Sequence, residues 1–124
     1  MTQKRSEHAC FVDEKTSTIH VMGGYYGEPL KSTESWTFGT DSWISDESSE
    51  LPIRLSSASA VSANSNEYVG YIAGGETDNS IQLPSVWALR RDDMKWIRLT
   101  SKTLEHSRAY STLLNLQGDQ IPGC

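Results

Sequence analysis

The sequence predicts an all-β protein that contains two copies of one unit, each a four-stranded antiparallel sheet. Three observations lead to this fold class. A pair of glycines recurs 51 residues along the chain, as Gly23-Gly24 and Gly74-Gly75. Short stretches rich in Val, Ile, Thr, Tyr and Trp alternate with turn-forming segments such as DEKT, GTDS, SANSNE and RRDD. No long segment keeps its apolar residues at helical spacing, so helices are not expected.

Two tryptophans in each unit repeat in the same order as the glycines. Trp36 recurs as Trp87 after 51 residues, and Trp43 recurs as Trp96 after 53 residues. Small differences in spacing are expected because turns vary in length. Self-similarity at a period near 50 is the signature of a repeat architecture. We therefore expect Gly23, Trp36 and Trp43 to superpose on their counterparts in the second unit.

An arginine opens each unit. Arg54 follows Arg5 by 49 residues, and Arg108 follows Arg54 by 54 residues. The stretch AYSTLLNL after Arg108 is typical of a first strand, which predicts the start of a third unit. Its glycine pair would fall near position 128, beyond Cys124.

Each unit is expected to contain four short strands separated by turns. The expected strands of the first unit lie at about residues 7–13, 17–22, 33–38 and 42–45, and those of the second at about residues 55–62, 68–73, 84–89 and 95–99. The whole chain, 1–124, then divides into units 5–51, 52–104 and 105–124, the last of them incomplete.

This pattern resembles the kelch repeat of β-propellers, in which each blade has four strands. The resemblance covers Arg5 to about Leu116. The matching residues are Gly23-Gly24 and Gly74-Gly75 (the double glycine), Trp36 and Trp87 (the aromatic position usually held by Tyr), Trp43 and Trp96 (the Trp that follows), and Arg5, Arg54 and Arg108 (the blade-opening Arg). It implies a partial kelch-type β-propeller of two blades and the first strand of a third.

The repeated residues suit packing between blades. Glycine lets neighbouring backbones approach closely and adopts dihedral angles that a Cβ atom forbids. The tryptophans fill the space between sheets with large apolar surfaces. Propellers close with about four to eight blades, so two blades leave apolar faces open. The chain is then a fragment of a larger propeller, a subunit that self-associates into a ring, or an open arc, which is the least stable of the three.

Composition excludes several classes of function. Eleven basic and sixteen acidic residues give a net charge of −5, which argues against nucleic acid as a partner. No window reaches the roughly 18 apolar residues that a membrane helix needs. The N-terminal stretch has no apolar segment typical of a secretory signal, so a cytoplasmic or other intracellular location is expected. Cys10 and Cys124 are too few for a disulfide framework.

No catalytic, metal-binding or cofactor-binding site is expected. His8 and Cys10 form an H-x-C pair, but a metal site needs three or four ligands, so a strand histidine and a small buried thiol are favoured. The acidic residues fall in predicted turns and form no acid–base pair. The sequence contains neither a G-x-S-x-G elbow nor a phosphate-binding loop.

The kelch resemblance implies a non-catalytic module for protein–protein interaction that binds a protein or peptide partner. Tyr25 and Tyr26 follow the double glycine on a loop and suit a contact surface. Arg54 and Arg108 are the other candidate contact residues, although a salt bridge or hydrogen bond at the blade junction is favoured for both. The alternative is a piece of a propeller enzyme resembling galactose oxidase or a sialic acid epimerase. The three scattered histidines do not supply the copper ligands that galactose oxidase needs.

Consecutive loops of a meander alternate between the two ends of its sheet. The loops after each double glycine and the segments before each blade-opening Arg therefore share one end, which we expect to bind the partner. The residues expected there are Tyr25, Tyr26, Glu28, Lys31, Asp46, Glu47, Glu50, Arg54, Glu76, Asp78, Asn79, Lys102, His106 and Arg108. Their charges are mixed, so a strongly acidic peptide is not an obvious ligand.

Overall fold

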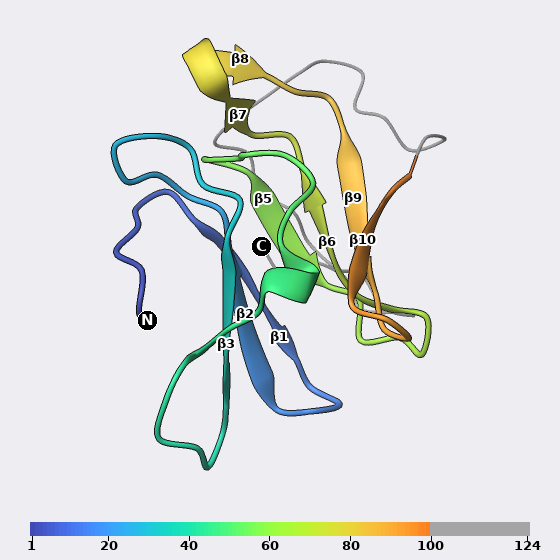
Figure 1. Cartoon of the computed structure of the whole chain (residues 1–124). Coiled ribbons are helices and arrows are strands. Elements are labelled where there is room, and N and C mark those ends of the chain that lie inside the picture. Colours follow the sequence, from blue (N-terminus) through green and yellow to red (C-terminus); the bar gives the residue numbers. More distant parts are fainter. Residues whose placement is uncertain (100–124) are drawn as a thin grey trace, which may run out of the picture.

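The computed structural model describes residues 1–99, which fold into two antiparallel four-stranded sheets packed against each other (Figure 1). No α-helix occurs within these residues. The predicted all-β class with four-stranded antiparallel sheets is confirmed, and the arrangement is compatible with a partial kelch-type propeller. The predicted third unit, with Arg108, lies outside the described residues. Within residues 1–99, no helical segment has the length and apolarity that crossing a bilayer requires.

The first sheet is a meander in which neighbouring strands are also consecutive in sequence. Its strands are β1 (Ala9–Asp13), β2 (Thr18–Met22), β3 (Thr33–Thr37) and β4 (Ile44–Ser45). Residues of β1 alternate between buried and exposed, because successive side chains of a strand point to opposite faces of a sheet. A short 3-10 turn, η1 (Glu47–Ser49), follows β4.

The second sheet repeats this meander with one insertion. Its strands are β5 (Ser59–Ser62), β6 (Tyr68–Ala73), β9 (Val86–Arg90) and β10 (Lys95–Arg98), in the order β5-β6-β9-β10. A small hairpin stands between β6 and β9, and consists of β7 (Glu76–Thr77), the 3-10 turn η2 (Asp78–Ser80) and β8 (Ile81–Gln82).

The first strand of each sheet begins later than predicted. We expected the strands to start at Glu7 and Leu55, whereas β1 starts at Ala9 and β5 at Ser59. Glu7 has a φ of 53° and Ser57 a φ of 58°, both in the left-handed region that interrupts an extended strand. These two residues stand 50 positions apart, so the interruption itself repeats.

The double glycines have the same backbone conformation in both sheets. Gly23 and Gly74 have φ values of 65° and 70°, and Gly24 and Gly75 have φ values of 100° and 96°. A Cβ atom on Gly24 would lie 2.6 Å from a backbone oxygen of the segment leading into β1. Left-handed dihedrals and close backbone contact both require glycine at these positions.

The loop that follows the double glycine is two residues longer in the second sheet. Met22 pairs with Thr33 across the ten residues 23–32, whereas Ala73 pairs with Val86 across the twelve residues 74–85. The hairpin β7–β8 lies within the longer loop. Positions on the third strand are therefore related by a shift of 53 rather than 51.

This shift makes the predicted match of Trp36 with Trp87 wrong. Trp36 pairs with Ile19, four residues before its double glycine. The residue four before the second double glycine is Gly70, and it pairs with Leu89. Leu89 is therefore the structural counterpart of Trp36. The insertion comes before the third strand, which also explains why the interval from Trp87 to the next tryptophan is long.

Trp87 instead corresponds to an acidic residue of the first sheet. Trp87 pairs with Ile72, and Glu34 pairs with Val21, each two residues before a double glycine. The two positions thus have equivalent backbones and very different side chains.

Trp43 and Trp96 both follow the third strand of their sheet and are related by the same shift of 53. Ile44 pairs with Ser35, and Ile97, 53 residues later, pairs with Ala88. Trp43 and Trp96 directly precede these two isoleucines. They therefore occupy equivalent places.

The predicted match of Arg5 with Arg54 is also wrong. Ser6 and Ser56 each pair with the residue that follows a double glycine, so these serines are counterparts. Arg5 therefore corresponds to Leu55, and Arg54 lies one residue earlier. A displacement of one residue moves a side chain to the other face of extended chain, because such side chains alternate.

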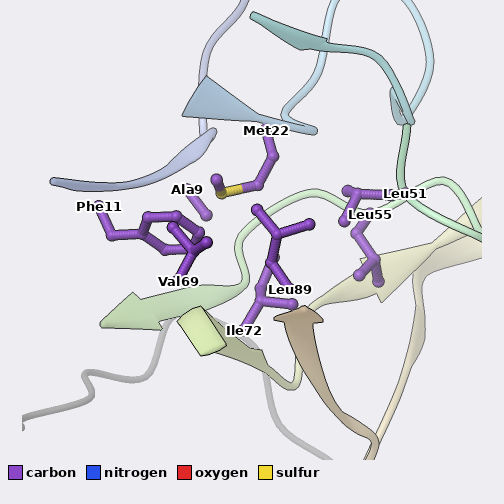
Figure 2. Close-up of a cluster of buried hydrophobic side chains, with 8 residues drawn as sticks. All are labelled: Ala9, Phe11, Met22, Leu51, Leu55, Val69, Ile72 and Leu89. Carbon is purple, nitrogen blue, oxygen red and sulfur yellow. The ribbon is translucent and has the colours of Figure 1, made fainter. Parts of the chain in front are cut away.

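The hydrophobic core lies between the two sheets (Figure 2). Its buried residues are Ala9, Phe11, Met22, Leu51, Leu55, Val69, Ile72 and Leu89. Phe11 packs closely on the second sheet, because a Cβ atom built on Gly70 would lie 2.6 Å from its ring. Gly70 therefore allows the two sheets to approach each other.

Polar contacts also join the sheets through β1. The Ser62 hydroxyl donates to the Val12 carbonyl at 2.6 Å and accepts from the Val12 N–H at 3.1 Å. Arg91 donates two hydrogen bonds to the buried carboxylate of Asp13, at 2.7 and 3.0 Å. Burial alone would raise the pKa of Asp13, but hydrogen bonds from Arg91 and Thr16 outweigh it and hold the pKa below its ordinary value.

Candidate functional site

The loops after the two double glycines meet at one end of the sheets, at the top of Figure 1. Backbone bridges link them to the segments that lead into β1 and β5: Ser6 to Tyr25, Leu30 to Leu55, and Ser56 to Glu76. The surface formed by residues 5–8, 23–32, 50–58 and 74–85 is called the loop end below. Because backbone hydrogen bonds join its segments, the backbone that carries these side chains is held in a defined arrangement.

A hollow of about 450 Å³ opens at the loop end between the two blades. This volume lies within the range of sites that bind small ligands or single side chains. The residues that line it are Glu7, Tyr25, Gly27, Glu28, Pro29, Ser56, Glu76, Thr77, Asn79 and Ser80.

The two predicted aromatic contact residues differ in their relation to this hollow. Tyr25 is 42% exposed and lines the hollow, while Tyr26 is 59% exposed and is not among the lining residues. The backbone of Tyr25 exchanges two hydrogen bonds with Ser6, at 2.7 and 3.0 Å. Tyr25 therefore presents a ring from a fixed backbone, which suits a contact residue.

Arg54 lies beside the hollow and contacts two of the residues that line it. Its guanidinium forms an ion pair with Glu28 at 2.6 Å and donates to the Pro29 carbonyl at 3.2 Å. The Arg54 side chain is 39% exposed. The sequence interpretation favoured such a junction contact. Arg108, the fourth predicted contact residue, lies outside the described residues.

Glu7 is a lining residue that the sequence reasoning missed. It was assigned to a strand, but its left-handed backbone places it at the loop end. Its carboxylate accepts a hydrogen bond from the Ser57 hydroxyl at 3.1 Å. Composition and spacing carry no signal for this position, because the interruption of the strand depends on pairing with distant residues.

Arg5 is buried beneath the loop end rather than exposed on it. Its guanidinium donates to the carbonyls of Gly23 and Ser32, at 2.7 and 2.9 Å, and to the Glu34 carboxylate at 2.9 Å. The side chains of both partners in this ion pair are at most 1% exposed. Arg5 thus holds the double glycine and the start of β3 in place.

Among the other candidates, Cys10 differs from the expected buried thiol. Cys10 is exposed, because Ala9 and Phe11 on either side of it face the second sheet. His8 is also exposed. Within residues 1–99, no group of three or more His, Cys, Asp and Glu side chains is placed to hold a metal ion.

The chain is similar to Kelch-like protein 23. Over 90 residues, 72% of this chain, the identity is 29% to the proteins of that name from Homo sapiens, Pongo abelii and Mus musculus. This chain covers 15% of the length of these relatives. No protein-family model matches the chain. Together with the two four-stranded sheets, this similarity indicates a kelch-type relationship.

Proposed function

We propose that this chain is a non-catalytic protein-interaction module of the kelch type. It binds a protein or peptide partner at the loop end, through a contact centred on Tyr25 and Tyr26 with Arg54 at its rim. Residues 5–51 and 52–104 serve as its two blades. The hollow at the loop end, with a Tyr25 ring exposed beside it, is the observation that carries this proposal.

Three features support a contact surface at this end. Aromatic residues and arginine dominate the energy of many protein interfaces, and both are present and partly exposed here. Backbone bridges fix the loops that carry them, which lowers the entropy lost on binding. The similarity to proteins named Kelch-like favours an interaction module over an enzyme. Because the similarity covers a small part of those proteins, the partner itself must come from experiment.

Differential capture tests the proposal. The tagged chain would be used to capture proteins from a cell lysate, and the captured set quantified by mass spectrometry. We expect the double variant Tyr25→Ala/Tyr26→Ala to lose its specific partners, since a true hot spot contributes on the order of 2 kcal/mol or more, roughly thirtyfold in affinity. Arg54→Ala should weaken the same partners to a smaller extent.

Arg90→Ala is the matched control at the opposite end of the sheets. Arg90 has a side-chain exposure of 42%, close to that of Arg54, and it also forms an ion pair at 2.6 Å, with Asp93. Circular dichroism would check that each variant folds. Partners retained by the tyrosine variant and lost with Arg90→Ala would refute the assignment of the binding surface.

A further inference from the structure

Among residues 1–99, the residues that line the hollow at the loop end include Glu7, Glu28 and Glu76, and none of them is Lys or Arg. Glu28 forms an ion pair with Arg54, and the Glu7 carboxylate accepts a hydrogen bond from the Ser57 hydroxyl. The Glu76 carboxylate has no ion pair or side-chain hydrogen bond to any residue within 1–99. A ligand of opposite charge would therefore be attracted to the Glu76 carboxylate without competing with a partner from these residues.

Ser56 supplies a second, independent sign that a ligand binds here. It is 3% exposed and lines the hollow. Its backbone N–H and carbonyl both pair with Glu76, at 2.9 and 2.8 Å, but its hydroxyl has no hydrogen-bond partner within residues 1–99. Because the Ser56 hydroxyl oxygen is not fully enclosed, it can form a hydrogen bond with a group that enters the hollow.

Tyr25 lines the same hollow and is 42% exposed, so its aromatic ring is available to a ligand there. A cation over an aromatic face is attracted by the ring quadrupole. Carboxylate, hydroxyl and aromatic ring together are the groups that recognise an ammonium or a guanidinium. They oppose the binding of a phosphate or a carboxylate, which Glu76 would repel.

We propose that this hollow binds the cationic side chain of a Lys or Arg residue in a partner peptide. The proposal rests on the peptide-binding function proposed above and specifies its chemistry. The Glu76 carboxylate accepts charge-assisted hydrogen bonds from the cation, and the Ser56 hydroxyl accepts a further one. The ring of Tyr25 packs against the cation or against the methylene groups of the side chain.

A peptide selection tests this assignment. The full-length chain would be immobilised and screened against a phage-displayed library of random heptapeptides. We expect the enriched peptides to share a Lys or Arg at one position. The most enriched peptide would be synthesised with a fluorescent label in two forms, one with its basic residue and one with norleucine there. Affinities would be measured by fluorescence anisotropy.

Three variants of the chain make the result specific. Glu76→Gln should weaken the basic peptide about tenfold, because it removes a charge-assisted hydrogen bond, and should leave the norleucine peptide unchanged. Ser56→Ala should weaken it by about threefold, as expected for one lost hydrogen bond. Asp92→Asn changes an exposed carboxylate in the turn between β9 and β10, at the opposite end, and should have no effect.

The outcomes separate this proposal from the proposed function. Enriched peptides without a shared basic residue, or equal affinity for the parent chain and the Glu76→Gln variant, would overturn the cation site and leave peptide binding intact. Peptides whose binding is lost with Asp92→Asn would also overturn it. A screen in which the parent chain enriches no peptide above the empty support would overturn both.

Discussion

The two sheets share the same meander but fill two equivalent positions in opposite ways. In the first sheet, Arg5 and Glu34 form an ion pair whose side chains are at most 1% exposed. In the second sheet, their counterparts by register are Leu55, which is 1% exposed, and Trp87. The comparison shows that the fold accepts an ion pair at these positions in one sheet and two largely apolar side chains in the other, with the Trp87 Nε1–H buried without a partner within residues 1–99.

The ion pair is tolerated because its hydrogen bonds are nearly complete. Thr2 donates two hydrogen bonds to Glu34, at 2.6 and 2.8 Å, and the Gln3 N–H donates another at 3.1 Å. Burial alone would raise the pKa of Glu34, but these bonds and the bond from Arg5 hold it below the ordinary value. This polar network, in which only the Arg5 Nε lacks a partner within residues 1–99, also fixes the N-terminal segment beside β3.

Breaking the ion pair on one side is the largest effect expected. Glu34→Ala leaves the buried Arg5 guanidinium without its counter-charge, so we expect a loss of about 3–5 kcal/mol in the free energy of unfolding. Urea denaturation followed by tryptophan fluorescence would measure it.

The apolar residues at the equivalent positions of the second sheet suggest the matched control. The double change Arg5→Leu/Glu34→Met removes both charges, and it should cost much less than Glu34→Ala alone. If the double variant is as unstable as the single one, the two charges are not coupled and the comparison between the sheets fails.

The register shift predicts unequal roles for Trp36 and its counterpart Leu89. Leu89 is 2% exposed in the core, so Leu89→Ala should cost about 2–5 kcal/mol. Trp36 is partly exposed and packs on Phe38, with ring centroids 4.8 Å apart, so Trp36→Ala should cost only about 1 kcal/mol. A larger loss for Trp36→Ala than for Leu89→Ala in urea denaturation would argue against this register.

A substitution at Gly70 tests whether the absence of a side chain there allows the two sheets to pack closely. Gly70→Ala places a Cβ atom 2.6 Å from the Phe11 ring, so we expect overpacking to cost about 1–3 kcal/mol. Thermal unfolding would show a lower midpoint. The second change Phe11→Leu should recover part of the loss, because it removes the ring that the new methyl group meets. If Phe11→Leu does not restore any of the lost stability, the strain caused by Gly70→Ala does not lie between the sheets.

The smallest expected effect is the change in stability with pH that His20 causes. The counterpart of His20 in the second sheet is Tyr71. Burial lowers the pKa of His20 from 6.5; Arg91 acts in the same direction, while Asp13 and Asp46 oppose it. The unfolded chain therefore binds the proton first as the pH falls, and stability decreases below about pH 6.5. Urea midpoints at pH 7.5, 6.5 and 5.5 should fall slightly for the parent chain.

The variant His20→Gln separates this effect from the titration of carboxylates. Its urea midpoint should stay level between pH 7.5 and 5.5, because the lowered pKa values of Asp13 and Glu34 confine their loss of stability to more acidic solutions. If the urea midpoint decreases equally in the parent chain and in the His20→Gln variant, the pH dependence comes from other groups.

Much of the loop end could be predicted from the sequence, because loop order in a meander follows from strand order. That reasoning brought Tyr25, Arg54 and Glu76 to one end of the sheets, and the structure places all three there. It could not find Glu7 or Ser56, because their positions in the hollow depend on a strand interruption and on bridges to distant loops. The partner remains a prediction.

The sequence by itself determined the repeat, the four-stranded units and the need for glycine after β2 and β6. These follow from local chemistry, since turn residues, β-branched residues and glycine act within a few positions of the chain. Only the tertiary structure decided which residues are equivalent. An insertion of two residues before β9 made Leu89 rather than Trp87 the counterpart of Trp36, and an offset of one residue exposed Arg54 while Arg5 is buried. Register depends on hydrogen bonds between strands, and residue spacing along the chain does not record them.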